Sequence, residues 1–70
     1  MINFQFDPEE TVEWIGVDSL SLRIAVRRIM ALPKERRRLV ALYRGAGKEP
    51  AFFGASHIEW LAALPEFEAN

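Results

Sequence analysis

The 70-residue chain has no cysteine and one histidine, and these absences exclude several kinds of site. Without cysteine there is no disulfide framework, no cysteine-based zinc or iron–sulfur site and no cysteine nucleophile. His57 makes no convincing zinc site, because Glu59 beside it would need further ligands. General-base catalysis by His57 would need a nucleophile held nearby, and Ser56 is only its neighbour in sequence. We therefore expect no metal, no cofactor and no enzymatic activity.

Long apolar runs and a signal-peptide pattern are also missing. No apolar run approaches the roughly 20 residues of a membrane helix, and residues 1–7 lack a basic start followed by an apolar stretch. Half of the residues are hydrophobic and 27% are charged, which is typical of a globular chain. We expect one domain over residues 1–70, located in the cytoplasm and without membrane contact.

The apolar spacing predicts a mostly α fold of three to four helices. The clearest helix begins after Asp18 or Ser19, either of which can cap its N-terminus. One apolar face follows at the i, i+3, i+4, i+7 and i+8 positions. This face consists of Leu22, Ala25, Val26, Ile29 and Met30. A second apolar line consists of Leu20, Ile24 and Ala31. A homo-oligomer would bury this second line.

The N-terminal part of the chain carries both helix and strand signals. Residues 2–6 alternate apolar and polar side chains, which predicts a short strand. Asp7 can cap a helix over residues 8–15, and Pro8 suits its first position. A strand in the same segment is the alternative prediction, because Val12, Trp14 and Gly16 occupy alternate positions.

Proline and glycine delimit a third predicted helix over residues 33–44. Pro33 ends the preceding helix and can begin a new one, and Gly45 and Gly47 end it. Its expected core face consists of Leu39, Leu42, Tyr43 and Ala46.

The last third of the chain is predicted as a loop followed by a helix. Residues 45–55 are loop-like, and residues 51–53 either pair with the N-terminal strand or plug the core. Ser56 and Glu59 have the spacing of a capping box. The helix they begin runs to about Leu64, ahead of Pro65. Its inward residues are Ile58, Leu61 and Ala62, and Phe67 is expected to fold back against the core.

The near-zero net charge of −1 conceals three charge blocks. Residues 1–22 carry five acids and no base, and residues 49–70 carry four acids and no base. Residues 23–48 carry all nine bases and a single acid, Glu35. Such blocks either neutralise one another within the fold or present a basic face to an acidic partner.

The basic block contains the candidate partner-binding residues. They are Arg27, Arg28, Lys34, Arg37, Arg38, Arg44 and Lys48. An acidic protein and a nucleic acid are the two candidate partners, and a solvated face paired with the acidic ends is the third interpretation. Two helices joined at Leu32 and Pro33 hint at a helix-turn-helix, but the pI of about 5.8 lies far below that of typical nucleic-acid-binding domains.

The stretch Gly16-Val17-Asp18-Ser19-Leu20 resembles the Gly-x-Asp-Ser-Leu attachment motif of acyl and peptidyl carrier proteins. In that family the serine carries a phosphopantetheine arm at the start of a helix. The resemblance therefore implies Ser19 as the modified residue. The chain departs from the family because only 18 residues precede Ser19 and because the next segment carries arginines instead of acids.

The sequence as a whole favours a small protein-interaction module, an adaptor or inhibitor that docks a basic, aromatic-lined helical face on an acidic partner. Trp, Tyr and Arg dominate binding hot spots, and five aromatic rings compete for burial in a small core. These are Trp14, Phe52, Phe53, Trp60 and Phe67. The chain length is also typical of accessory proteins of phages and mobile elements. A nucleic-acid-binding protein is the alternative.

Overall fold

The computed structural model describes residues 7–48 and 50–67, and these form a small α+β domain. The elements in chain order are β1 (Thr11–Trp14), β2 (Asp18–Ser21), α1 (Leu22–Met30), α2 (Lys34–Arg37), β3 (Leu42–Tyr43), β4 (Phe52–Phe53), α3 (Ala55–Ala62) and the 3-10 helix η1 (Pro65–Phe67). The strands form an antiparallel sheet in the order β2-β1-β3-β4. The prediction of a mostly α helical bundle is therefore wrong.

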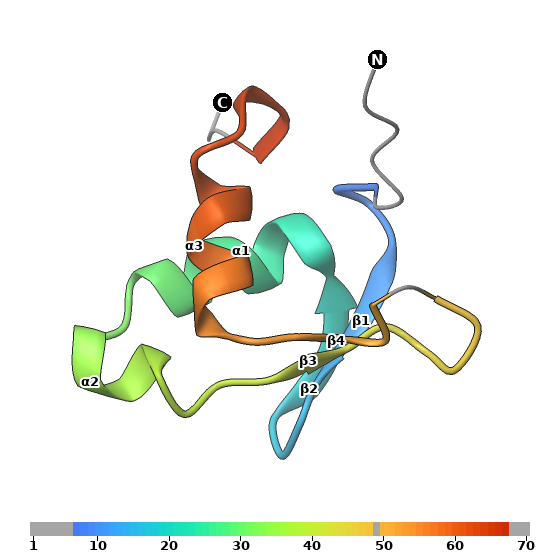
Figure 1. The fold of residues 1–70 in the computed structure, drawn as a ribbon, viewed down its shortest axis with the longest axis horizontal. Coiled ribbons are helices and arrows are strands. Elements are labelled where there is room, and N and C mark those ends of the chain that lie inside the picture. The colour runs from blue at the N-terminus through green and yellow to red at the C-terminus, as the bar shows by residue number, and fades with distance from the viewer. Residues whose placement is uncertain (1–6, 49, 68–70) are drawn as a thin grey trace.

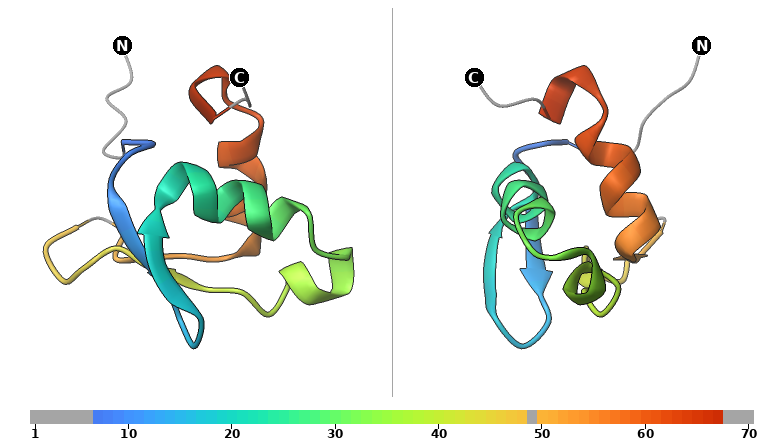
Figure 2. Two further views of the ribbon diagram at one scale, coloured as in Figure 1. Left: turned by 180° about the vertical axis from the view of Figure 1, so that it is seen from behind. Right: turned by 90° about the vertical axis from the view of Figure 1, so that its left-hand side faces the viewer.

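The helices lie to one side of the sheet (Figure 1). α1 packs against β1, β2 and α3, and α3 also packs against β4. α2 lies apart from these layers and protrudes at one end of the molecule (Figure 2). The fold thus has a sheet layer, a helix layer and a projecting basic turn.

β1 and β2 form a hairpin whose turn requires glycine. The backbone N–H of Val17 donates to the carbonyl of Trp14 at 2.8 Å, and Ile15 and Gly16 lie between them. Gly16 has φ +82°, a left-handed conformation that side chains with a Cβ disfavour. The predicted helix over residues 8–15 would end before Gly16, whereas in the structure Gly16 lies in the turn between two strands.

The predicted helix over residues 8–15 is wrong, and the competing strand pattern is confirmed. Val12 pairs with Leu20 across the hairpin and is buried. Trp14 points to the same side of β1 and packs against the core. Pro8 and its neighbours form only a turn ahead of β1 and do not begin a helix. The alternating burial of residues 11–14 is that of a strand.

The apolar face predicted for the central helix is confirmed in α1. Leu22, Ala25, Val26 and Ile29 are buried, and Met30 packs against them. The N-cap is Ser21, whose hydroxyl accepts a hydrogen bond from the N–H of Ile24 at 3.3 Å. The predicted caps Asp18 and Ser19 lie in β2 instead. Leu20 also lies in β2, so the second apolar line is not a helix face.

The predicted helix over residues 33–44 is replaced by α2 and β3. α2 ends at Arg37, and Leu39 is 87% exposed. Leu42 pairs with Trp14 on one side and Phe53 on the other, and it is fully buried. In the sheet, β3 has hydrogen-bonding and side-chain partners on both sides, in β1 and β4. A helix on the surface would contact the core on one side only.

The last helix begins and ends about two residues earlier than predicted but buries the predicted side chains. α3 has Gly54 as its N-cap with no side-chain capping bond, so the predicted cap at Ser56 is wrong. Ile58 and Leu61 are fully buried, and Phe67 folds back to 4% exposure, as predicted. The predicted strand over residues 2–6 lies outside the described residues.

Side-chain alternation divides the sheet into two faces. Val12, Leu42 and Phe53 point toward the helices and are buried in the core. The intervening residues point away from the helices. They are Thr11, Glu13, Ser19, Tyr43 and Phe52. We call this second side of the sheet the outer face.

Leu39 and Leu42 distinguish this fold from a long third helix, which would bury both. Leu42→Ala should lower the free energy of unfolding by about 3 kcal/mol, while Leu39→Ala should change it by less than about 0.5 kcal/mol. Urea unfolding followed by circular dichroism measures both values. Equal losses for the two variants would contradict the assignment of β3.

Candidate functional site

Arg44, one of the predicted partner-binding residues, is buried inside the protein. Its Nε and Nη2 donate to the two carboxylate oxygens of Glu10 at 3.3 Å each, and its Nη1 donates to the carbonyl of Pro50 at 3.1 Å. The guanidinium also lies 4.8 Å from the ring centroid of Phe53. The side chain of Arg44 is 0% exposed and that of Glu10 is 8% exposed. Arg44 is therefore a structural cation and not a contact for a partner.

Glu10 also forms an ion pair with Lys48, a second predicted binding residue. Nζ of Lys48 lies 3.5 Å from Oε1 of Glu10, and the backbone N–H of Asp7 donates to Oε2 at 3.1 Å. Glu10 thus ties the loop after β3 to the segment that leads into β1. The charge of Lys48 is directed at this carboxylate, although its side chain is 49% exposed.

Arg37 joins α2 to the helix layer. Its Nη1 lies 3.4 Å from Oε2 of Glu59 on α3 and 3.6 Å from Sδ of Met30 on α1. Its Nε is buried without a hydrogen-bond partner among the residues that the structure describes. The side chain is only 19% exposed. Arg37 thus holds the projecting turn in place and presents little of its charge to solvent.

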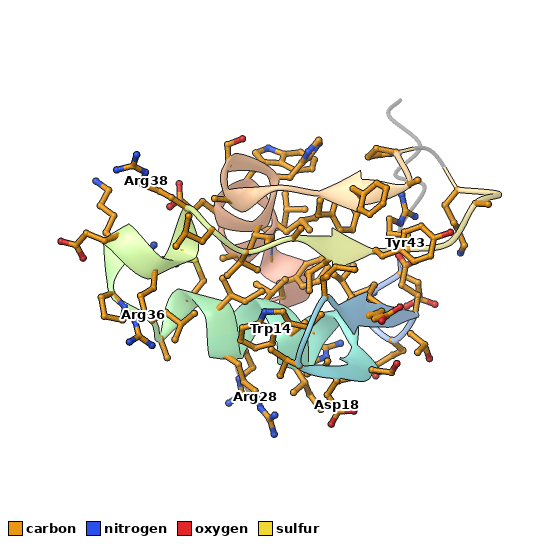
Figure 3. All side chains as sticks on the ribbon, turned by 90° about the horizontal axis from the view of Figure 1, so that it is seen from below. Trp14, Asp18, Arg28, Arg36, Arg38 and Tyr43 are labelled. Carbon is orange, nitrogen blue, oxygen red and sulfur yellow. The ribbon has the colours of Figure 1, made fainter. Side chains whose placement is uncertain are left out.

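The remaining predicted cations stay exposed. We define the basic end as the exposed cations Arg27, Arg28, Lys34, Arg36 and Arg38. Within residues 7–48 and 50–67 none of them has a salt bridge. Figure 3 shows Arg36 and Arg38 on the α2 end of the molecule and Arg28 extending outward from α1. Arg27 and Arg28 lie in the last turn of α1, and Lys34 and Arg38 lie in and directly after α2. Four of the seven predicted binding residues are therefore exposed without a salt bridge among the described residues, whereas Arg37, Arg44 and Lys48 contact carboxylates of the chain.

Arg36 belongs to the basic end although the sequence analysis omitted it. In a helix over residues 33–44, Arg36 falls three residues before Leu39 and thus on the expected core face. The real helix stops at Arg37 and has no buried residue, so that face does not exist. Five consecutive charged residues follow Pro33, and an exposed turn made of them includes Arg36.

The charges of α2 act in both directions on the stability of a helix. Lys34 stands at the N-terminal end, where the helix dipole disfavours a cation. Lys34 and Arg38 are four residues apart, a spacing at which like charges repel on a helix. Glu35 in the first turn, and Arg36 and Arg37 toward the C-terminal end, complement the dipole. No residue of α2 is buried, so core packing does not account for its exposed cations.

An apolar side chain accompanies the basic end. Leu39 follows Arg38 and is 87% exposed, the largest exposure among the large hydrophobic residues of the described chain. Single exposed apolar residues are common on protein surfaces. Leu39 places an exposed apolar side chain directly beside the cations of α2, where an apolar group could contact it.

The resemblance to carrier proteins is not matched by the geometry at Ser19. The residue lies within β2 and is exposed, and its N–H donates to Oδ1 of Asp18 at 2.8 Å. α1 begins three residues later and is capped by Ser21. Ser19 thus lacks the helix-start position that the resemblance implies.

Other candidate chemistry gains no support from the fold. His57 is exposed on α3 and packs its ring 5.5 Å from that of Phe53. The residues described by the structure include no group of three or more histidines and acids placed to hold a metal ion. In the same residues, every helix is too short or too polar to span a membrane.

The adjacent residues Glu9 and Glu10 test the structural role of Arg44. Glu10→Gln should lower the free energy of unfolding by about 3 kcal/mol or more, because it replaces by a neutral amide the carboxylate that accepts hydrogen bonds from Nε and Nη2 of the buried Arg44. Glu9→Gln should cost less than about 1 kcal/mol, because Glu9 is 65% exposed in its 2.9 Å pair with Arg23. Urea denaturation provides the comparison. Similar losses for both variants would show that the buried Glu10–Arg44 pair contributes no more to the free energy of unfolding than the exposed Glu9–Arg23 pair.

Known proteins give no guide to the role of this surface. Comparison of the chain with protein-family models, curated protein sequences and solved structures finds no match.

Proposed function

We propose that the protein is a non-enzymatic binding module, a small adaptor or inhibitor, that docks its basic end on an acidic segment of another protein. The observation that carries this proposal is the separation of the cations into two groups. Arg23, Arg37, Arg44 and Lys48 face carboxylates of the same chain. The five cations of the basic end are exposed, two in the last turn of α1 and three in or directly after α2, which has no buried residue.

An acidic partner gains most from cations in this arrangement. A partner carboxylate need not displace an internal salt bridge, because none involves the basic end within the described residues. Arginine can bind a carboxylate through two parallel hydrogen bonds. Clustered charge of one sign also raises the rate at which an oppositely charged partner arrives.

A protein partner fits the observations better than a nucleic acid. Nucleic-acid affinity depends on many phosphate contacts. The acidic residues of this chain, whose net charge is −1, would repel the phosphates of a nucleic acid. A short acidic segment needs only local complementarity. Leu39 at 87% exposure adds a place for an apolar side chain, which a phosphate backbone does not offer.

Neutralising two arginines tests the basic end. The probe is a blocked pentapeptide of four glutamates around a central leucine, added to ¹⁵N-labelled protein. Amide shifts should concentrate in residues 27–39, and Arg36→Gln/Arg38→Gln should weaken binding about fivefold or more, because each exposed charge pair contributes up to about 1 kcal/mol. Arg37 and Arg44 are unsuitable for this test because their replacement disturbs internal pairs.

A matched control separates local contacts from net charge. Ala46→Glu/Ser56→Glu makes the same change of two charges at exposed positions outside the basic end, and it should bind the peptide as the parent does. Equal weakening by both double variants would remove the basic end from the account. Tighter, steeply salt-dependent binding of duplex DNA through residues 27–39 would favour the nucleic-acid alternative.

A further inference from the structure

A single row of side chains crosses the outer face of the sheet. The pairing registers place Ser19 opposite Glu13, Glu13 opposite Tyr43 and Tyr43 opposite Phe52. These four residues come one from each strand, and we call them the outer row. The helix layer covers the other face, where the neighbouring residues of the strands are buried.

The aromatic half of the outer row is accessible. The rings of Tyr43 and Phe52 are 4.9 Å apart at 41°, so they form a tilted pair. Phe52 is 54% exposed, whereas Phe53, the next residue of β4, points to the other face of the sheet and is buried. A paired, half-exposed phenylalanine beside a tyrosine offers the faces of two rings to a ligand.

The acidic member of the outer row is unengaged in the described part of the chain. Glu13 is exposed, and its carboxylate has no hydrogen bond or salt bridge there. By contrast, Glu9, Glu10 and Glu59 each hold a cation of the chain. Directly opposite residues in an antiparallel pair have their Cβ atoms about 5 Å apart. The side chain of Glu13 therefore starts beside that of Tyr43, within reach of a cation bound over the aromatic pair.

This combination selects the charge of a ligand. A cation is attracted to the face of an aromatic ring and to a carboxylate. An anion would be repelled by Glu13, and a wholly apolar surface would bury that carboxylate without a partner. Arg44 does not fill this role, because it follows Tyr43 along the chain, lies over Phe53 on the core side and is held by Glu10.

We propose that the outer row is a second binding surface, one that takes an arginine or lysine side chain from a peptide segment of a partner protein. The cation lies over the Tyr43–Phe52 pair, and the Glu13 carboxylate accepts its hydrogen bonds. This surface has the opposite charge preference to the basic end and contains none of its residues. The inference therefore stands independently of the proposed function.

Two blocked pentapeptides test the outer row on the full chain. One carries a central arginine between glycines, and the other carries citrulline, which has nearly the same shape without the charge. Addition of the arginine peptide to ¹⁵N-labelled protein should shift the amides of the outer row. The arginine peptide should bind about threefold or more tightly than the citrulline peptide, as an exposed cation–π contact and charge pair allow.

Three substitutions make the test specific, and two of them, Glu13→Gln and Glu35→Gln, remove the same charge. Glu13→Gln should abolish the preference for arginine over citrulline, and Phe52→Ala should weaken binding of the arginine peptide by a similar factor. Glu35→Gln, which removes an exposed acid from α2, should leave both affinities unchanged. The dispersed amide spectrum of each variant reports whether it is folded.

Three results would overturn the inference. They are equal binding of the two peptides, shifts confined to residues outside the sheet, and a Glu13→Gln variant that retains the arginine preference. Concentration-dependent association without peptide, with shifts at both the outer row and residues 27–39, would assign the surface to a second copy of the chain and also refute the partner named here.

Discussion

The buried contact between Arg44 and Glu10 is the constraint on which the rest of the arrangement depends. A guanidinium that is 0% exposed is tolerated only when its donors are satisfied and its charge is paired. Glu10 provides the charge, the Pro50 carbonyl provides a further acceptor, and the ring of Phe53 lies against the cation. These groups come from before β1, from the loop after β3 and from β4. The contact therefore fixes the middle of the sheet.

Internal pairing of some cations determines which others remain available. The acidic ends of the sequence do fold onto the basic middle, but only at defined positions: Glu9, Glu10 and Glu59 hold Arg23, Arg44 and Arg37. The cations without a salt bridge among the described residues lie in the last turn of α1 and in and directly after α2. On β1, the Glu13 carboxylate has no partner among the described residues. One pairing scheme thus leaves unpaired charges of opposite sign on different elements of the fold.

The sequence predicts those features that local spacing encodes. The buried stripe of α1 is a strong period-3.6 pattern, and Ile58, Leu61 and Phe67 occupy the core as expected. β3 could not be predicted in this way, because a two-residue strand has no period and Leu42 and Tyr43 also match helical spacing. Their pairing with Glu13 and Trp14 joins segments about thirty residues apart.

The candidate site was predictable only in part for the same reason. Charge counting found the basic block, and four of its seven named residues are exposed without a salt bridge among the described residues. Whether Arg44 is available depends on Glu10, 34 residues earlier in the chain, and no local pattern encodes that contact. Arg36 was missed because its role depends on where α2 ends.

Hydrogen exchange of the arginine Nε–H groups, measured by ¹⁵N NMR on the folded protein, tests the separation of the cations most directly. The account predicts slow exchange for Arg37 and Arg44, whose Nε atoms are buried or bonded to Glu10. It predicts rates close to those of free arginine for the four arginines of the basic end. Protection of these four, or fast exchange at Arg44, would contradict the account.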